Sequence, residues 1–355
     1  MKIVTVAGAR PQFVKASPLS RELRQRHEEI LVHTGQHYDA SMSEVFFQEL
    51  DLPEPDYDLG VGSGSHGAQT GAMLAAIEKV LQQELPDAVL VYGDTNSTLA
   101  GALAAAKLHI PVAHVEAGLR SFNRAMPEEI NRVMTDHLST WLFAPAETAR
   151  QQLEREGIVA GVSVVGDIML DAVLMHRERA AKSSPYPDAA GVQPEGYILA
   201  TIHRAESTDD QGRLVAILAG LNRLDLPVVL PLHPRTRKQL AAFGLVPGSN
   251  IVLLDPVGFL DMLQLERLAA CVVTDSGGVQ KEAYYLGVPC VTVRGETEWV
   301  ETVAAGWNRL TIADPDALAN AVRQMTSSAR ELPRPPLYGS GDTAQRIVAA
   351  LTGDS

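Results

Sequence analysis

Residues 114 to 132, HVEAGLRSFNRAMPEEINR, place many chemically active side chains directly after a short apolar run, IPVA. The stretch contains one histidine, three glutamates and three arginines. Charged groups beside a core cost free energy unless they are paired, exposed or used. A carboxylate in such a position can take up or deliver a proton, and an arginine can hold a carboxylate or a phosphate. This stretch therefore predicts acid/base chemistry.

We assign Glu116, Arg120, Glu128 and Arg132 to a reaction centre rather than to a core. A helix that begins at Pro127 puts Glu128 and Arg132 on one face, four residues apart, and this spacing predicts that the two side chains pair. Such a pair can hold an ionised carboxylate in place. The alternative is a simple surface ion pair with no chemical role.

A second candidate site lies in TDSGGVQKEA, residues 274–283. A strand is predicted to end before Ser276, Gly277 and Gly278, and a helix is predicted to follow them. Glycines let the backbone approach a ligand, and the first N–H groups of a helix bind anions, so this turn suits a diphosphate. Glu282, one turn into the helix, can accept hydrogen bonds from ribose hydroxyls. The alternative is an ordinary strand-to-helix turn.

Three further charged residues follow predicted strands in the first half of the chain. Arg10 and Lys15 lie in GARPQFVK, and Asp94 lies in VYGDTNSTLA. An arginine offers phosphate two donors in a planar fork, so Arg10 is predicted to contact an anion. Asp94 is predicted to act at the same sheet end, although aspartate is also a common helix N-cap.

Two histidines end predicted strands in the second half of the chain. His203 lies in ATIHRAES and His233 in LPLHPRT. A histidine in such a turn titrates near neutrality and can serve as an acid or a base. The alternative for each is a structural histidine whose nitrogens are satisfied by the backbone.

The elements that must position these residues alternate regularly. Apolar runs such as KIVTVA, DAVLVYG and CVVTD are separated by amphipathic runs such as GAMLAAIEKVLQQEL and LVAILAGLNRL. Strands that are apolar throughout and separated by helices predict parallel sheets covered on both faces. Ligands of such sheets bind beyond the carboxyl ends of the strands, where the candidate residues lie.

The chain of 355 residues is longer than one core usually supports. A stretch rich in Pro, Gly and Ser near residues 182–196 predicts a linker. We therefore predict an α/β fold of two doubly wound, Rossmann-like domains facing across a cleft. The N-terminal domain is predicted to cover residues 1–180 and to hold the catalytic residues. The C-terminal domain is predicted to cover residues 181–355 and to bind the diphosphate, with its last helix packing back on the N-terminal domain.

Several classes of function are excluded by what the sequence contains. The formal net charge of −13, without a local basic run, excludes a nucleic-acid partner. No metal-ligand spacing occurs, and no segment is long enough to span a membrane or to serve as a signal peptide, so the cytoplasm is expected. Cys271 and Cys290 are predicted as packing residues. Gly62, Gly64 and Gly67 match the dinucleotide fingerprint, but the preceding residues make a poor strand, so we reject a nicotinamide site.

Taken together, the chain resembles the non-hydrolysing UDP-N-acetylglucosamine 2-epimerases over nearly its whole length. The motifs GARPQFVK, GDTNSTLA, HVEAGLR, PEEINR, HRAE, TDSGGVQKEA and VRGETEWVE occur in the family's order. This resemblance implies a two-domain fold like that of glycosyltransferases of the B type. It also implies a homodimer, a UDP-sugar substrate, and no metal or redox cofactor.

The reaction that the resemblance implies inverts C2 of a UDP-N-acetylhexosamine. UDP is eliminated across C1–C2, a glycal remains, and UDP adds back as a proton reaches the other face. Matching motifs assign acid/base or charge-stabilising roles to Asp94, Glu116, Glu128 and His203, with no decision on which carboxylate removes the C2 proton. They assign substrate and UDP binding to a larger set: Arg10, Lys15, Arg132, His233, Ser276, Gly277, Gly278 and Glu282.

Departures from the family pattern favour one subgroup. Gln12 stands where typical members have glutamate. Bacterial relatives build a second, activating sugar-nucleotide site from two glutamines and an arginine. This chain retains one glutamine, Gln36, but has Asp39 and Ala68 in place of the other two residues. Activation by a second sugar nucleotide is therefore not expected. The chain is most similar to the epimerases of UDP-2,3-diacetamido-2,3-dideoxy-glucuronic acid, which form the mannuronic epimer for cell-surface polysaccharide precursors. A neutral Gln12 would avoid repelling a C6 carboxylate.

Three alternatives remain open at this point. A UDP-sugar-dependent glycosyltransferase of the same fold would need an acceptor pocket but no acid/base groups at C2. A hydrolysing epimerase would release free N-acetylmannosamine and UDP. A non-catalytic binding protein would lose only affinity when a carboxylate is replaced.

Overall fold

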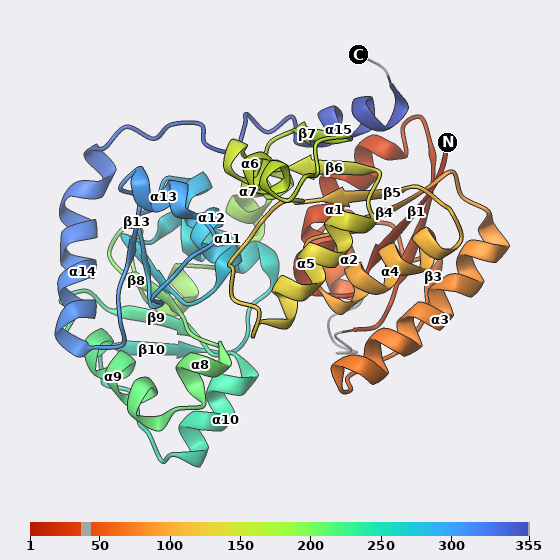
Figure 1. Cartoon of the computed structure of the whole chain (residues 1–355). Helices are drawn as coiled ribbons and strands as arrows, with labels where there is room; N and C mark the ends of the chain where they lie inside the picture. Colours follow the sequence, from red (N-terminus) through yellow and green to blue (C-terminus); the bar gives the residue numbers. More distant parts are fainter. Residues whose placement is uncertain (37–43, 354–355) are drawn as a thin grey trace. The chain divides into compact units, whose positions relative to one another are not determined.

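The computed structural model describes residues 1–36 and 44–353, which divide into two compact units. Unit 1 comprises Met1–Met175 and Tyr338–Ser355, and unit 2 comprises His176–Leu337. Each unit contains one parallel sheet with helices on both faces (Figure 1). This confirms the predicted class of two doubly wound α/β domains. None of the described helices combines the length and the apolar character needed to cross a bilayer.

The sheet of unit 1 has seven strands in the order β3-β2-β1-β4-β5-β6-β7. The chain order reverses between β1 and β4, which is where such sheets bind ligands. The strands are β1 (Lys2–Ala7), β2 (Glu28–His33), β3 (Tyr57–Asp58), β4 (Ala88–Tyr92), β5 (Val112–Val115), β6 (Trp141–Ala144) and β7 (Val162–Val164). The helices are α1 (Arg10–Leu23), α2 (Glu44–Glu49), α3 (His66–Glu84), α4 (Asn96–Lys107), α5 (Pro127–Leu138), α6 (Glu147–Arg155) and α15 (Thr343–Thr352). The boundary between the units falls within α7 (Ile168–Ser183).

The sheet of unit 2 has six strands in the order β10-β9-β8-β11-β12-β13. Here the chain order reverses between β8 and β11. The strands are β8 (Ile198–Thr201), β9 (Val228–Pro231), β10 (Ile251–Leu254), β11 (Cys271–Thr274), β12 (Cys290–Thr292) and β13 (Asn308–Leu310). The helices are α8 (Ala205–Thr208), α9 (Gln211–Asn222), α10 (Pro234–Ala242), α11 (Phe259–Leu268), α12 (Gly277–Leu286), α13 (Val300–Ala304) and α14 (Pro315–Ser328), with 3-10 turns at Asp188–Ala190 and Ala329–Glu331.

The apolar runs form these strands because both faces of each sheet are covered. In β1, Ile3 packs in a core with α1 and α15, whereas Val4 and Val6 pack on the opposite face with α3 and α4 (Figure 1). In β8, Ile198 and Leu199 likewise belong to different cores. Because successive side chains of a strand point to opposite faces, an unbroken apolar run satisfies both layers. Cys271 and Cys290 are free and buried, as expected.

The segment predicted as a linker belongs to unit 2. Ala190 and Val192 are buried in the same core as Leu199 of β8, and Tyr186 packs against that core. Its proline and glycine content therefore accompanies a short 3-10 turn at Asp188–Ala190 and not an open connection. Composition alone does not distinguish these two outcomes, because both require residues that end helices and strands.

Asp171 fastens the returning helix α15 to unit 1 and makes stability depend on pH. The carboxyl is 6% exposed, and its Oδ1 accepts a 2.9 Å hydrogen bond from the Ala344 N–H. Burial raises the pKa of Asp171 to about 6 despite the opposing effect of that bond. The folded chain therefore keeps this proton up to about pH 6, while the unfolded chain releases it near 3.8, the ordinary pKa of an aspartate. Folding stability from this group is complete at low pH and falls as pH rises through 6.

We expect Asp171→Asn to be more stable than the native chain at pH 7.5, by about 2–3 kcal/mol, because the amide resembles the protonated acid. The two proteins should differ little at pH 4. Urea unfolding at both pH values measures the difference. An effect of the same size at both values would show that the ionisation of Asp171 is not its source.

Candidate active site

One cluster of predicted residues lies at the carboxyl ends of β1, β4 and β5, which are neighbours in the sheet of unit 1. Arg10 begins α1 after β1, Asp94 follows β4, and Glu116 follows β5. Parallel strands deliver their following residues to the same edge, as predicted. The structure therefore brings Asp94 and Glu116 into one region, together with Lys15 and Arg132, which pair with them.

Glu116 is held by its backbone and by Lys15. Its φ of +74° is unusual for a residue other than glycine, and its side chain is 5% exposed. Lys15 Nζ donates to Glu116 Oε2 in a short ion pair. Gly93 lies directly beside this pair, since a Cβ there would be in ordinary contact, 3.4 Å from Glu116 Oε2 and 3.5 Å from Lys15 Nζ, and its φ of +62° favours glycine. Such a fixed carboxylate, with its own cation, is suited to proton transfer.

Asp94 pairs with Arg132, but Glu128 does not take the place predicted for it. Arg132 Nε and Nη2 lie 2.9 and 2.6 Å from Asp94 Oδ2, and Arg132 Nη1 donates to Glu129 Oε2 at 2.9 Å. Glu128 is exposed. The predicted pairing of Glu128 with Arg132 is therefore wrong. Residues three apart in a helix also lie on one face, and on α5 it is Glu129, three residues before Arg132, that pairs with it.

Glu129 is a residue that the sequence analysis missed. It is 2% exposed, and its carboxylate accepts 2.9 Å hydrogen bonds from the backbone N–H groups of Ser121 and Phe122. Burial alone would raise the pKa of Glu129, but these bonds and Arg132 together lower it. Glu129 therefore stays ionised and ties the loop after β5 to the Asp94–Arg132 pair. Its place in PEEINR was the available signal, but it did not distinguish the two glutamates.

A buried network lies behind this cluster. His114 Nδ1 is 2.7 Å from Asp136 Oδ1, and His114 Nε2 is 2.7 Å from the Gly93 carbonyl. Burial opposes ionisation of Asp136, yet His114 and Arg120 outweigh it and lower its pKa. The two ring nitrogens of His114 thus each face an oxygen acceptor. The network fixes the turn that carries Asp94.

Arg120 belongs to that network and not to the reaction centre. Its side chain is 1% exposed. Its Nη1 donates to Asp136 Oδ2 at 2.7 Å, and its Nε and Nη2 hold Glu156 at 2.7 Å each. The prediction of a chemical role for Arg120 is wrong, because the residues after β5 turn this side chain back into unit 1.

Gln12 is also internal. It is 2% exposed. Its Oε1 accepts from the N–H groups of Gly8 and Ala9 at 2.9 and 3.1 Å, and its Nε2 donates to the Tyr92 carbonyl and Thr98 Oγ1 at 2.9 and 3.0 Å. An amide makes at most four such bonds, and Gln12 makes all of them. The hypothesis that it faces a C6 carboxylate of the substrate is wrong in this structure.

Two of the three positions predicted for a second, activating site lie in described parts of unit 1. Gln36 Oε1 accepts from the N–H and Oγ of Ser97 at 3.0 and 2.7 Å, so this side chain serves the start of α4. Ala68 lies in the first turn of α3, where it is exposed. Asp39 lies outside the described residues. Arg10 is half-buried, with its guanidinium 5.4 Å from the centre of the Phe46 ring.

Unit 2 holds a second cluster, at the carboxyl ends of β8, β9 and β11. His203 follows β8 and is oriented by Asp275, which the sequence analysis did not select. The buried Asp275 carboxylate accepts from the N–H groups of His203, at 3.1 and 3.0 Å, and Arg204, at 3.0 Å. It also lies 3.3 Å from His203 Nδ1. Burial lowers the pKa of His203, against the attraction of Asp275. A neutral histidine can act as a base.

The Ser-Gly-Gly turn opens α12 as predicted. The Ser276 side chain makes no capping hydrogen bond to α12 within the described residues. A Cβ at Gly277 would lie 3.9 Å from Arg204 Nη2, and one at Gly278 would lie 3.7 Å from Glu282 Oε1. A cation, helix N–H groups and a carboxylate thus surround one turn. This arrangement suits a diphosphate joined to a ribose.

His233 stands at the start of α10. Its Nδ1 accepts from the Arg235 N–H at 3.1 Å, and its ring centroid lies 5.3 Å from that of His203. His233 is therefore an N-cap, as the structural alternative stated, and it also lies next to the predicted acid/base histidine.

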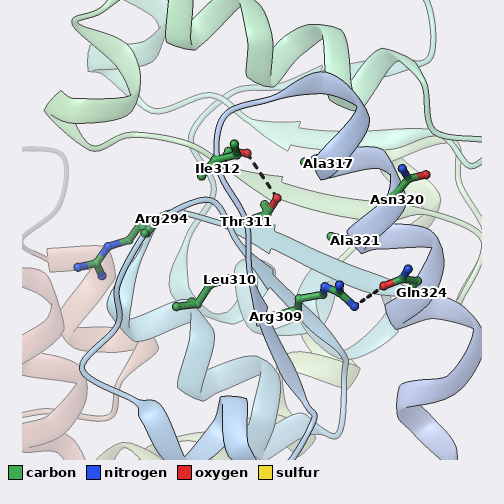
Figure 2. A pocket seen from close by; sticks show the side chains of 10 residues that line it. Arg294, Arg309, Leu310, Thr311, Ile312, Ala317, Asn320, Ala321 and Gln324 are labelled. Atoms are coloured by element: carbon green, nitrogen blue, oxygen red, sulfur yellow. Dashed lines mark hydrogen bonds between the residues drawn. The ribbon is translucent and has the colours of Figure 1, made fainter.

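A pocket of about 450 Å³ lies elsewhere in unit 2, between the end of β13 and α14 (Figure 2). Arg309 of β13 points toward Gln324 of α14 and donates to it. None of the residues that line this pocket is among the predicted site residues. We therefore base the site on the two clusters at the strand ends.

The chain is similar to known proteins over nearly its whole length. A family described as UDP-N-acetylglucosamine 2-epimerase matches residues 21–352. The UDP-2,3-diacetamido-2,3-dideoxy-D-glucuronate 2-epimerase of Pseudomonas aeruginosa is 51% identical over 360 residues, which cover 99% of each chain. The crystal structure of Methanocaldococcus jannaschii UDP-GlcNAc 2-epimerase in complex with UDP-GlcNAc and UDP is 46% identical. It has a TM-score of 0.92 and covers 99% of this chain and 100% of that chain.

A more distant likeness concerns the fold alone. Phytolacca americana UGT2, solved with UDP-2fluoro-glucose and pterostilbene, has a TM-score of 0.63 at 12% identity, over 99% of each chain. It agrees with the predicted glycosyltransferase-B-like class.

Proposed function

This chain belongs to the UDP-N-acetylglucosamine 2-epimerase family, and from that premise we propose how its two clusters invert C2 of a UDP-sugar. The protein is an isomerase of the 2-epimerase type. Its mechanism, its preferred sugar and its site residues are the proposed part. The observation that carries the proposal is the pairing of three of the four candidate acid/base groups with a fixed partner: Glu116 with Lys15, Asp94 with Arg132, and His203 with Asp275.

In the proposed mechanism, unit 2 holds UDP and unit 1 supplies acid/base groups to the sugar. The diphosphate binds the N–H groups at Ser276, Gly277 and Gly278, and Glu282 accepts from the ribose hydroxyls. A carboxylate of unit 1 removes the C2 proton, and the C1–O bond breaks with its electron pair leaving on UDP. UDP then adds back to C1 of the glycal, while C2 receives a proton on the opposite face.

The remaining predicted residues take supporting places in this mechanism. Arg10 and Lys15 provide positive charge near the sugar and the diphosphate, and Arg132 holds the Asp94 side chain in place. His203 and His233 stand beside the UDP side of the sugar. Glu128 is an exposed group on α5, and we retain it as an acid/base candidate because its motif matches. No metal or redox cofactor takes part in the proposed steps.

We propose UDP-2,3-diacetamido-2,3-dideoxy-glucuronic acid as the preferred substrate and UDP-GlcNAc as the second. The 51% identity with the Pseudomonas aeruginosa enzyme supports this order. Turnover of each sugar in D₂O, without an acceptor, tests both reaction and preference. An epimerase places deuterium at C2 of the recovered UDP-sugar and releases no free sugar. Retention of hydrogen at C2 would contradict the mechanism, and faster turnover of UDP-GlcNAc would contradict the substrate.

Gln12→Glu separates stability from sugar preference. An ionised glutamate has no donor for the Tyr92 carbonyl or for Thr98 Oγ1. We therefore expect the free energy of unfolding to fall by about 1–3 kcal/mol. The ratio of turnover between the two UDP-sugars should stay unchanged, since Gln12 is internal. Urea unfolding and steady-state kinetics measure the two effects. A shift in preference toward UDP-GlcNAc would show that position 12 reads the sugar after all.

We further propose that the enzyme works as a homodimer in the cytoplasm, which the family resemblance supports. Light scattering at enzyme concentrations near those of the assay tests the dimer, and a monomer mass would contradict it.

A further inference from the structure

The first turn of α1 holds a cation that the helix itself does not stabilise. Arg10 is the first residue of α1, and the first turn contains no acidic residue. The N–H groups at a helix N-terminus favour negative charge and disfavour a cation. The Arg10 side chain is nevertheless half-buried, so other parts of unit 1 must hold it. An arginine that is ordered before its ligand arrives binds more tightly, because less side-chain freedom is lost on binding.

The ring of Phe46 on α2 is one such support. The guanidinium carbon of Arg10 lies 5.4 Å from the centre of this ring, within the distance at which an aromatic face attracts a cation. Phe46 is 7% exposed, and exclusion of water strengthens the attraction. The ring carries no net charge, so it holds the guanidinium and leaves its positive charge available to an anion.

Phe46 is itself fixed by a cluster of aromatic rings. Its ring meets that of Phe13 edge-on, with centroids 6.3 Å apart, and that of Phe47 at 6.5 Å. Phe13 and Phe47 also pack against each other at 5.0 Å. Edge-to-face contacts of this kind are favourable. Phe13 follows Arg10 by three residues on α1, which places both on one face of that helix. The face of α1 on which α2 docks is therefore the face that carries Arg10.

We propose that Phe46 is a positioning residue, which holds the Arg10 guanidinium in place for the diphosphate of the UDP-sugar without touching the substrate itself. The inference rests on the proposed function, because it takes Arg10 as a contact of the diphosphate. It gives α2, which none of the motifs of the sequence analysis includes, a part in substrate affinity. Without the ring, Arg10 would keep its charge but would have to be ordered as the substrate binds.

Two changes at position 46 test the contact. Phe46→Leu removes the ring but stays apolar, whereas replacement of Phe46 by 3,4,5-trifluorophenylalanine keeps the ring shape but weakens its attraction for cations. Phe47→Leu is the matched control, since it makes the same change in the same cluster. Calorimetric titration measures the affinity for UDP. We expect both changes at position 46 to weaken UDP binding about threefold to tenfold, with KM rising likewise and kcat near native. Phe47→Leu should stay within about twofold of native.

A double-mutant cycle shows whether Phe46 acts through Arg10. In an Arg10→Ala background, Phe46→Leu should have no further effect on the UDP affinity or on kcat/KM. An equal loss in both backgrounds would overturn the inference, and so would native affinity in the trifluorinated protein. Either result leaves the proposed function intact. Failure of the native enzyme to bind UDP, or a native kcat/KM in Arg10→Ala, would instead contradict the proposed function, from which Arg10 takes its role.

Discussion

Replacement of Glu116 by glutamine is expected to lower kcat by about 10²–10⁴-fold, the usual contribution of a positioned acid or base. The amide keeps the size of the side chain and the bond to Lys15, but it cannot take up the C2 proton. Binding of UDP should remain, since the proposed nucleotide anchors belong to unit 2. Epimerisation followed by NMR, and deuterium entry at C2 in D₂O, measure the effect.

Two companion variants make this result interpretable. Asp94→Asn should cause a loss in the same range, because it removes the carboxylate that Arg132 holds. Glu154→Gln, an exposed change on α6, should leave kcat unchanged. Glu116→Gln with near-native exchange at C2 would remove Glu116 from the acid/base set. A parallel loss of UDP affinity and turnover in both carboxylate variants would show that these carboxylates serve substrate binding and not proton transfer.

Asp136→Ala is expected to destabilise unit 1 by about 3–5 kcal/mol, the cost of removing one partner from a buried ion pair. The variant removes the buried carboxylate that lies 2.7 Å from both His114 Nδ1 and Arg120 Nη1. It also releases the His114 ring that holds the Gly93 carbonyl next to Asp94. Turnover should therefore fall together with stability.

The pH dependence of this effect follows from the lowered pKa of Asp136. Its stabilisation is complete above the ordinary aspartate range and is lost as pH falls below 3.8 toward the lower folded pKa. Urea unfolding of native and variant protein should therefore show the full difference at pH 7 and a shrinking one below pH 4. Glu147→Ala, at an exposed pair with Arg150 on α6, is the matched control and should cost little. A loss below about 1 kcal/mol at pH 7 would contradict a structural role of the network.

The strand ends were predictable from sequence, but the partners of their side chains were not. Apolar runs covered on both faces require parallel sheets, and parallel sheets deliver Asp94, Glu116, His203 and Ser276 to one edge of their unit. Glu128 lies four residues before Arg132 and Glu129 lies three residues before it, and both spacings allow an ion pair on a helix. Which glutamate pairs depends on how α5 is rotated about its axis. The sequence pattern contains no measure of that rotation.

Burial was the other quantity that sequence reasoning lacked. Arg120, Gln12 and Asp275 are polar residues within the motifs that predict the site. Each of them forms hydrogen bonds to the backbone or to another side chain of its own unit. Such residues satisfy groups far away in the chain, and only the folded structure shows which groups need them.

The account depends on the carboxylates of unit 1 and the nucleotide anchors of unit 2 acting on one and the same substrate molecule. A crystal structure of Glu116→Gln with its UDP-sugar tests this directly, because the variant should bind the substrate without consuming it. We expect the diphosphate at the Ser276–Gly278 turn and the pyranose C2 within hydrogen-bonding reach of positions 94 or 116. A pyranose that contacts unit 2 alone, with C2 distant from both carboxylate positions, would contradict the proposed mechanism.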